Sequence, residues 1–162
     1  MGHVLAYLIT MRGYGTWLHG DERGSVDSGH RGYGSAPVAT DKSLELMEAS
    51  LLKTQPITFD RPRRTAIATS LFEVCQHKGW TLLASNVRTN HVHVVVAAAE
   101  VTPEFVMNTF KSWATRAMVA SGALPHGTKA WSRHGSTRYL WTERSVHDAC
   151  VYVLEGQGPP LP

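Results

Sequence analysis

The sequence predicts an α+β protein in which helices pack on a mostly antiparallel sheet. Strand-like and helix-like patterns follow one another in the order strand, helices, two paired strands, helix, strand, helix. The chain has 162 residues and 43% of them are hydrophobic, which is enough for one core. We therefore expect a single domain over residues 1–162, with a glycine-rich loop inserted at about residues 12–40.

The first part of the chain contains one strand and two helices. Residues 3–11 are rich in branched and aromatic side chains, as strands are. Residues 41–54 have leucines and a methionine at helical spacing, and they predict an amphipathic helix. A second helix is expected within 59–80, where Asp60 is a suitable N-cap and Gly79 a suitable end.

The middle of the chain reads as a hairpin and a third helix. Residues 80–89 and 90–99 form two strand patterns joined by a tight turn. The second pattern is nearly continuous in apolar residues, which is typical of a central strand. Residues 101–122 predict a helix with Thr102 as its N-cap.

The last part of the chain is expected to hold a short strand and a final helix. Residues 124–143 are basic and tryptophan-rich, and they end in the short strand pattern RYLWT. Residues 145–158 predict the last helix, in which Ser145 and Asp148 are spaced like a capping box. This helix carries Tyr152.

The bulk charge permits a nucleic-acid partner without requiring one. The formal net charge is +3 and the pI is about 9.0. The apolar start at residues 1–10 is short and has no charged leader. We expect no signal peptide and no membrane span, and therefore a cytoplasmic protein.

Residues 90–96, NHVHVVV, hold the most informative pattern of the chain. Residues i and i+2 of a strand point to the same side, so His91 and His93 place two imidazoles side by side. Such a pair is a partial ligand set for a divalent ion, or simply two ordinary histidines. Three chemistries use it: zinc hydrolysis, nucleotide hydrolysis by a histidine triad, and metal-assisted phosphoryl transfer by a separate nucleophile. The triad needs a third histidine where this chain has Val95.

A nucleophile for the third chemistry is available in the last helix. Tyr152 carries a phenol, which is protonated at neutral pH and needs a metal ion to help it attack a phosphodiester. Glu155, at i+3, shares its helical face and could complete a metal shell, and Gln157 could do so if the helix loosens at Gly156. A tyrosine that packs its ring on the sheet is the structural alternative.

These residues resemble the HUH single-strand endonucleases. The His-hydrophobic-His strand and the single tyrosine in VYVLEGQG are similar to the one-tyrosine members, above all the REP-associated tyrosine transposases and related insertion-sequence transposases. The resemblance covers most of the chain, through GYGTWLHGDERGS, VRTNHVHVVV, MNTFKSWATRAM and WSRHGSTRYLWT in that order.

The resemblance implies a ferredoxin-like sheet, with the His-x-His pair on a central strand and the tyrosine on the C-terminal helix. It also implies a transposase that nicks and rejoins single-stranded DNA at hairpins, with Tyr152 forming a 5′-phosphotyrosine. His91 and His93 would hold Mg²⁺ or Mn²⁺. In the family a third polar ligand commonly lies one turn after the tyrosine, where this chain has Gly156. Glu155 or Gln157 would have to replace it.

Binding of the DNA strand requires cations for its phosphates and rings for its bases. The segment KAWSRHGSTR has three positive charges, one histidine and no acid, which favours a loop that faces phosphate. For each residue alone, a solvated charge or a core aromatic is the alternative. The candidates are Lys111, Arg116, Lys129, Trp131, Arg133, Arg138 and Arg12, with Trp17, Trp141 and His19 as further ones.

Two other functions stay open at this point. One is a DNA-hairpin binding protein that has lost cleavage through the change at Gly156, and the other is a nucleotide phosphohydrolase. The partner expected for the first-ranked function is a single-stranded DNA hairpin, bound by a monomer or a homodimer associated with the nucleoid.

Overall fold

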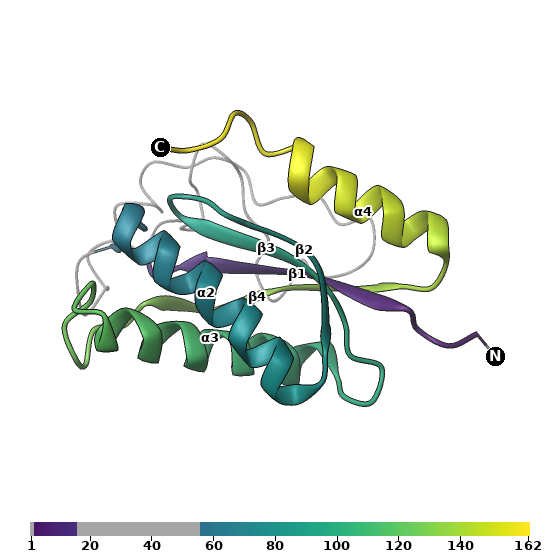
Figure 1. Cartoon of the computed structure of the whole chain (residues 1–162), viewed down its shortest axis with the longest axis horizontal. Helices are drawn as coiled ribbons and strands as arrows, with labels where there is room; N and C mark the ends of the chain where they lie inside the picture. The colour runs from purple at the N-terminus through teal and green to yellow at the C-terminus, as the bar shows by residue number, and fades with distance from the viewer. Residues whose placement is uncertain (1, 16–55) are drawn as a thin grey trace, which may run out of the picture.

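A computed structural model of the chain describes residues 2–15 and 56–162 (Figure 1). The helix expected over residues 41–54 and most of the inserted loop lie outside the described residues. The described elements are, in chain order, β1 (Ala6–Gly13), α2 (Arg61–Lys78), β2 (Thr81–Val87), β3 (His91–Ala97), α3 (Pro103–Ala120), β4 (Trp131–Leu140) and α4 (Glu143–Glu155).

The four described strands form one sheet in the order β2-β3-β1-β4, and each neighbouring pair is antiparallel. With α2 between β1 and β2 and α3 between β3 and β4, this is the ferredoxin-like arrangement. Helices α2 and α3 cover one face of the sheet, and α4 lies on the other face (Figure 1). The predicted fold class is confirmed, including the central position of the His-x-His strand.

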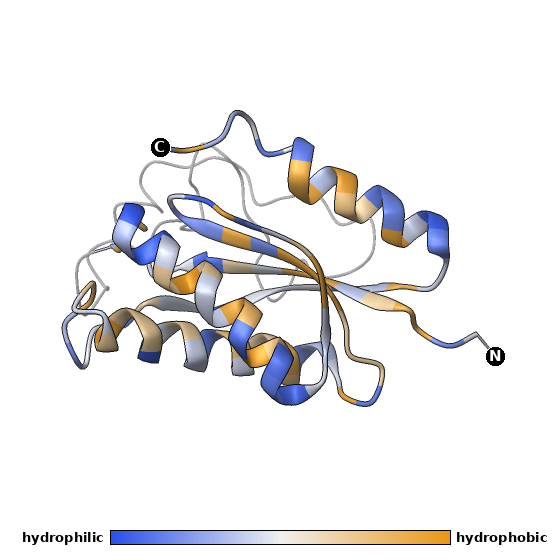
Figure 2. Cartoon of the chain, viewed as in Figure 1, coloured by the Kyte–Doolittle hydropathy of each residue, from blue (hydrophilic) through white to orange (hydrophobic). Residues whose placement is uncertain are grey.

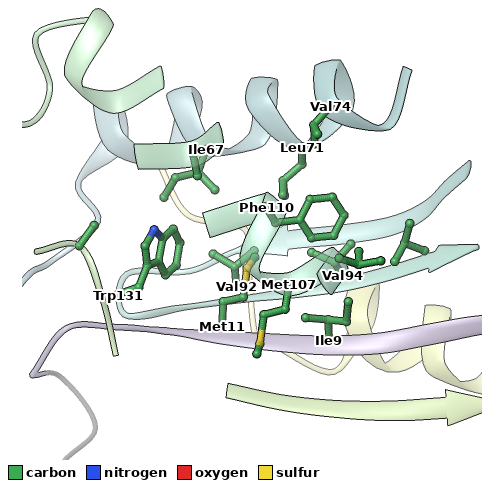
Figure 3. Close-up of a cluster of buried hydrophobic side chains, with 14 of the residues drawn as sticks. Ile9, Met11, Ile67, Leu71, Val74, Val92, Val94, Met107, Phe110 and Trp131 are labelled. Carbon is green, nitrogen blue, oxygen red and sulfur yellow. The ribbon is translucent and has the colours of Figure 1, made fainter. Parts of the chain in front are cut away.

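The main core lies between the sheet and the helices α2 and α3. Val92 and Val94 of β3 point into it and pack with side chains such as Leu71 and Phe110, all fully buried (Figure 3). Each helix carries both hydrophobic and hydrophilic residues, as helices with one face on a sheet do (Figure 2). A smaller cluster of buried residues, among them Val95 and Val153, lies beneath α4.

The predicted ends of α2 and α3 are confirmed. The Asp60 side chain accepts a hydrogen bond of 3.1 Å from the backbone N–H of Arg63. Gly79 closes α2 with φ of 73°, in the left-handed region that glycine enters at no steric cost. Thr102 caps α3 by accepting from the N–H of Phe105 at 3.2 Å.

Two predictions for the last part of the chain were wrong in their boundaries. Strand β4 begins at Trp131, well before the RYLWT pattern. The prediction missed its first residues because an edge strand is half exposed, and its polar residues show no clear hydrophobic pattern. Helix α4 begins at Glu143, and its N-cap is Thr142 instead of Ser145. Thr142 accepts from the N–H of Ser145 at 3.0 Å, and Ser145 Oγ accepts from the N–H of Thr142 at 3.1 Å.

None of the helices in residues 2–15 and 56–162 is both long and apolar enough to cross a bilayer.

Gly135 allows α3 to pack closely against β4 and β1. An added Cβ would lie 2.3 Å from Thr10 O and 2.7 Å from Met107 Sδ. Gly135→Ala should therefore lower the free energy of unfolding by about 1–3 kcal/mol through overpacking. Urea unfolding followed by circular dichroism measures this. Gly2→Ala, where nothing lies within 4 Å, is the control and should change nothing. Equal stability of both variants would contradict the packing described here.

Candidate functional site

The histidine pair lies on the α4 face of the sheet. Because Val92 and Val94 point to the α2/α3 core, His91 and His93 point the opposite way, as the alternation predicts. Their ring centroids are 4.7 Å apart. His93 is 6% exposed and His91 is partly exposed, so the pair forms a shallow polar site in an apolar strand.

Helix α4 carries Tyr152 to this pair. The helix packs Ala149 and Val153 on Val95 and its neighbours in the smaller core cluster. Asn86 of β2 fixes it further, since its Nδ2 donates to Val153 O at 2.9 Å. The Tyr152 ring centroid then lies 5.5 Å from that of His93, and the side chain is 48% exposed. A phenol in this position is next to the imidazoles and open to solvent.

Gln157 joins the histidines because the helix ends before it. Gly156 is the C-cap of α4, and the chain turns there. The Gln157 amide donates from Nε2 to Tyr152 O at 3.3 Å, which aims Oε1 at His91 Nε2, 3.4 Å away. Glu155, the alternative ligand, is exposed at the last residue of the helix.

The facing atoms of Gln157 and His91 have the chemistry of a cation site. His91 Nδ1 lies 2.6 Å from Asn90 Oδ1, so Nδ1 carries the proton that it donates. His91 Nε2 is then a bare lone pair, and it faces the Oε1 lone pairs of Gln157. A divalent ion between them would be bound by both. In the described parts of the chain, no group of three or more His, Cys, Asp or Glu residues could hold a metal, so this mixed set of imidazoles and an amide is the candidate.

The surroundings keep His93 neutral. Burial, followed by the neighbouring His91, lowers the pKa of His93 from 6.5 to about 4, although a hydrogen bond with Gln157 acts in the opposite direction. The positive charge of Arg12 also contributes to the lowering. A neutral imidazole at physiological pH is the form that binds metals.

Arg12 is the predicted DNA contact that lies nearest to this site. It pairs with His91 across β1 and β3, and Thr10 pairs with His93 in the same register. Burial lowers the pKa of Arg12 from its usual value. A guanidinium nevertheless keeps its charge in proteins.

Lys111, Arg116 and Trp131 lie together, but on the α3 side of the sheet. They line a hollow of about 580 Å³ together with Ser112 and Thr115. Lys111 is more deeply placed than a surface cation, because its Nζ donates to Ser132 O at 3.0 Å, and burial lowers its pKa. Arg116 is exposed and extends over the Trp113 ring at 5.4 Å.

Trp131 is a core residue instead of an open stacking surface. It is 7% exposed, packs on Phe59 at 5.1 Å between centroids, and donates from Nε1 to Thr115 Oγ1 at 3.0 Å. The exposed tryptophan of the described segments is Trp141, which stacks on Tyr139 with an angle of 12° between the rings. Trp17 and His19 lie outside the described residues.

The other predicted contacts are dispersed. Lys129 Nζ lies 4.7 Å from the centroid of the Tyr14 ring. Arg133 and Arg138 are both exposed on β4, and Arg138 pairs with Leu8, a residue that packs with the cluster beneath α4. Arg138 therefore lies on the α4 face of the sheet, which also carries the histidine pair.

Sequence reasoning missed the residues that hold the site in place. Thr10 shares a hydrogen bond of 2.8 Å with His93 Nδ1, Asn90 binds His91, and Asn86 ties down α4. Thr10 could have been singled out as a polar residue within an apolar strand. The asparagines lie beside a turn, where such residues are too common to attract notice.

Two solved structures are similar to this chain. A REP-associated tyrosine transposase bound to a REP hairpin aligns with a TM-score of 0.48 and 9% identity, over 93% of this chain and 65% of that one. The chain thus spans less than two thirds of that protein. A crystal structure of a candidate transposase from Deinococcus radiodurans R1 aligns with a TM-score of 0.51 and 13% identity, over 99% and 95% of the two chains. No curated protein sequence matches the chain.

Sequence comparison with protein families gives a direct match. The family described as "Transposase IS200 like" matches residues 51–144, more than half of the chain, and this stretch contains the histidine pair, α3 and β4. The chain belongs to the IS200-like transposase family, a family of enzymes that act on DNA.

Proposed function

We propose that the chain is a metal-dependent single-strand endonuclease and strand transferase that acts at DNA hairpins. The observation that carries this proposal is the meeting of three parts of the chain at one point. The Tyr152 ring lies 5.5 Å from that of His93, and Gln157 Oε1 lies 3.4 Å from His91 Nε2. This set contains a nucleophile and a metal-binding group on one face of the sheet.

His91, His93 and Gln157 would hold Mg²⁺ or Mn²⁺. Two imidazole nitrogens and one amide oxygen leave the other positions to water and phosphate oxygens, which such hard ions prefer. The ion supplies Lewis-acid polarisation of the scissile phosphate when bound. All three protein ligands are neutral, so the positive charge of the site is retained for the phosphate.

Tyr152 would be the nucleophile. Its Oη attacks the phosphorus, the bond from phosphorus to the 3′ oxygen breaks, and that oxygen leaves as a 3′-hydroxyl. The phenolic proton passes to water, which reaches the side chain because it is 48% exposed, and water gives a proton to the departing 3′ oxygen. The products are a 5′-phosphotyrosine and a free 3′ end. Rejoining is the reverse attack by a 3′-hydroxyl, so no nucleotide energy source is consumed.

Positive side chains would hold the strand at two distances from the cut. Arg12 is next to the histidine pair in register and is suited to the scissile phosphate or its neighbour. Arg116 and Lys111 line the hollow on the α3 side, across the sheet from Tyr152, and are suited to phosphates farther along. Three further residues stay predicted DNA contacts: Lys129, Arg133 and Arg138. Association with the nucleoid and assembly as a homodimer also stay predictions.

A hairpin binder without cleavage activity is the main alternative. Gly156 favours it, because the usual third-ligand position of the family has no side chain here. Gln157 argues against it, since the turn at Gly156 returns an oxygen ligand to the pair. A small-nucleotide phosphohydrolase would form no lasting bond to DNA, and the first experiment below separates it.

Loss of the phenolic oxygen should abolish the covalent product. Tyr152→Phe incubated with labelled hairpin DNA and Mn²⁺ should yield no slow-migrating species on a denaturing gel, a drop of at least about 10³-fold. Hairpin binding in a native gel should persist. Tyr139→Phe, a change at another exposed tyrosine, is the matched control and should cross-link normally. An adduct that survives in Tyr152→Phe would remove this residue from the chemistry.

Gln157, and not Glu155, should affect metal binding. Gln157→Ala should weaken Mn²⁺ binding about 10-fold, because one of three protein ligands is lost, whereas Gln157→Glu keeps an oxygen and should bind at least as well. Glu155→Ala should match the wild type. Electron paramagnetic resonance of free Mn²⁺ measures the three affinities without DNA. The reverse order, with Glu155→Ala weaker than Gln157→Ala, would reassign the third ligand.

Acid should destabilise the metal-free protein through His93. Its pKa is about 4 in the folded chain and 6.5 unfolded, so the unfolded state binds more protons between these values and stability falls as pH is lowered. From pH 7 to 5 the loss should be about 2 kcal/mol. Urea unfolding in EDTA measures it. His93→Asn should lack this component, while His126→Asn, at an exposed loop position, should retain it. An unchanged pH dependence in His93→Asn would be inconsistent with a neutral, buried His93.

Arg116 should contribute to binding and not to cleavage. Arg116→Ala should weaken hairpin binding and reduce the slope of log K against log salt by about 0.7–0.9, because one phosphate contact is lost. Cleavage at saturating DNA should be unchanged. Arg61→Ala removes an exposed arginine on α2 and controls for net charge. Identical salt slopes for the two variants would show that the hollow does not bind DNA.

A further inference from the structure

Each histidine of the pair is bound through the same ring nitrogen by a different polar residue. Thr10 Oγ1 of β1 is 2.8 Å from His93 Nδ1, and Asn90 Oδ1, in the turn before β3, is 2.6 Å from His91 Nδ1. Neither partner is a carboxylate. The two contacts come from separate segments of the chain, and both are made to the Nδ1 atom of the histidine ring.

The β1–β3 register fixes the first contact. Thr10 and His93 are direct partners in the antiparallel ladder, so their side chains leave the same face of the sheet. Both are buried, at 7% and 6% exposure. A hydroxyl in this place can accept a hydrogen bond from Nδ1–H, whereas a purely apolar residue would leave that buried N–H without its acceptor.

The turn between β2 and β3 fixes the second contact. Arg88 N donates to His91 O at 2.8 Å and closes the turn, while Asn90 O accepts from Gly13 N at 2.8 Å. The Asn90 backbone is therefore held to β1 independently of its side chain. Its Oδ1 lies within reach of His91 Nδ1 and can only accept, so the ring must carry its proton there.

The Asn90 contact sets which nitrogen of His91 is available to a metal, and the Thr10 hydroxyl, which can accept or donate, permits the same tautomer in His93. A ring protonated on Nδ1 has its lone pair on Nε2, and His91 Nε2 points at Gln157 Oε1. His93 lies on the same side, 4.7 Å from His91 between centroids. With the opposite tautomer, each Nε2 would carry a proton and repel a cation.

We propose that Thr10 and Asn90 are positioning residues that accept hydrogen bonds from Nδ1–H of His93 and His91 and thereby present both Nε2 atoms to one divalent ion. This inference rests on the metal site of the proposed function and adds two residues to it. Neither residue touches the ion or the DNA; each acts through its histidine.

Thr10 is tested by an isosteric pair of variants. Thr10→Val keeps the shape of the side chain and removes the acceptor, and Thr10→Ser keeps the hydroxyl. Mn²⁺ affinity, measured by electron paramagnetic resonance on the full chain without DNA, should fall about 10-fold in Thr10→Val and stay within about twofold of wild type in Thr10→Ser. Equal affinities of the wild type and both variants would overturn the role of Thr10.

Asn90 is tested in the same way. Asn90→Ala removes the acceptor and should weaken Mn²⁺ binding about 10-fold. Asn90→Asp keeps Oδ1 and should bind Mn²⁺ with the affinity of the wild type. The backbone bond from Gly13 N to Asn90 O is available in both variants. Weakening by both substitutions alike would indicate a disturbed turn and contradict an acceptor role.

A spectroscopic measurement separates positioning from general stability. Long-range ¹H–¹⁵N correlation spectra distinguish the two neutral tautomers of an imidazole. The metal-free wild type at pH 7.5 should show His91 protonated on Nδ1, and Asn90→Ala should lose this preference. A wild-type His91 protonated on Nε2 would overturn the proposal.

The outcomes also distinguish this inference from the proposed function. A wild type that binds no Mn²⁺ contradicts the metal site, and the tautomer spectra still decide the role of Asn90. A wild type that binds Mn²⁺ as well as Thr10→Val and Asn90→Ala do contradicts only the positioning role.

Discussion

The structure depends on β3, a central strand that is covered on both faces. One face carries apolar side chains and the other carries the two histidines. On one face of β3, valines fill the core beneath α2 and α3. On the other face, the same two-residue period places His91 and His93 under α4. Imidazoles in such a position are costly unless they are hydrogen-bonded, and Thr10 and Asn90 supply those bonds. A slip of the β1–β3 register by one residue would remove Thr10 from His93 and turn the histidines into the core.

The position of α4 follows from this strand. The helix has a small apolar footprint, in which Ala149 and Val153 meet Val95, and the Asn86 side chain binds its backbone at Val153. Small contacts of this kind hold the helix in register, with His93 buried and His91 still partly exposed. The end of the helix at Gly156 then brings Gln157 back toward the pair. The C-cap at Gly156 thus lets Gln157 reach His91 by a turn.

Much of the fold could be predicted from the sequence because local signals agree with the tertiary structure. Asp60, Gly79 and Thr102 define helix ends by their own chemistry, and continuous apolar residues mark β3 as central. Prediction failed at β4, where an exposed edge strand carries no clear alternation. The sequence left open whether Trp131 is a core or an exposed indole, because composition and spacing do not tell the two apart, and its side chain is buried. For the site, spacing predicts the histidine pair, but only the geometry of the turn shows that Gln157 faces His91.

The central claim is that His91, His93 and Gln157 bind one divalent ion beside Tyr152. Crystals of the protein soaked in Mn²⁺, measured at the manganese absorption edge, test it most directly. We predict an anomalous peak at bonding distance from Nε2 of both histidines and from Gln157 Oε1. A peak bonded to Nδ1 of either ring, or no peak between the three side chains in fully soaked crystals, would contradict this account.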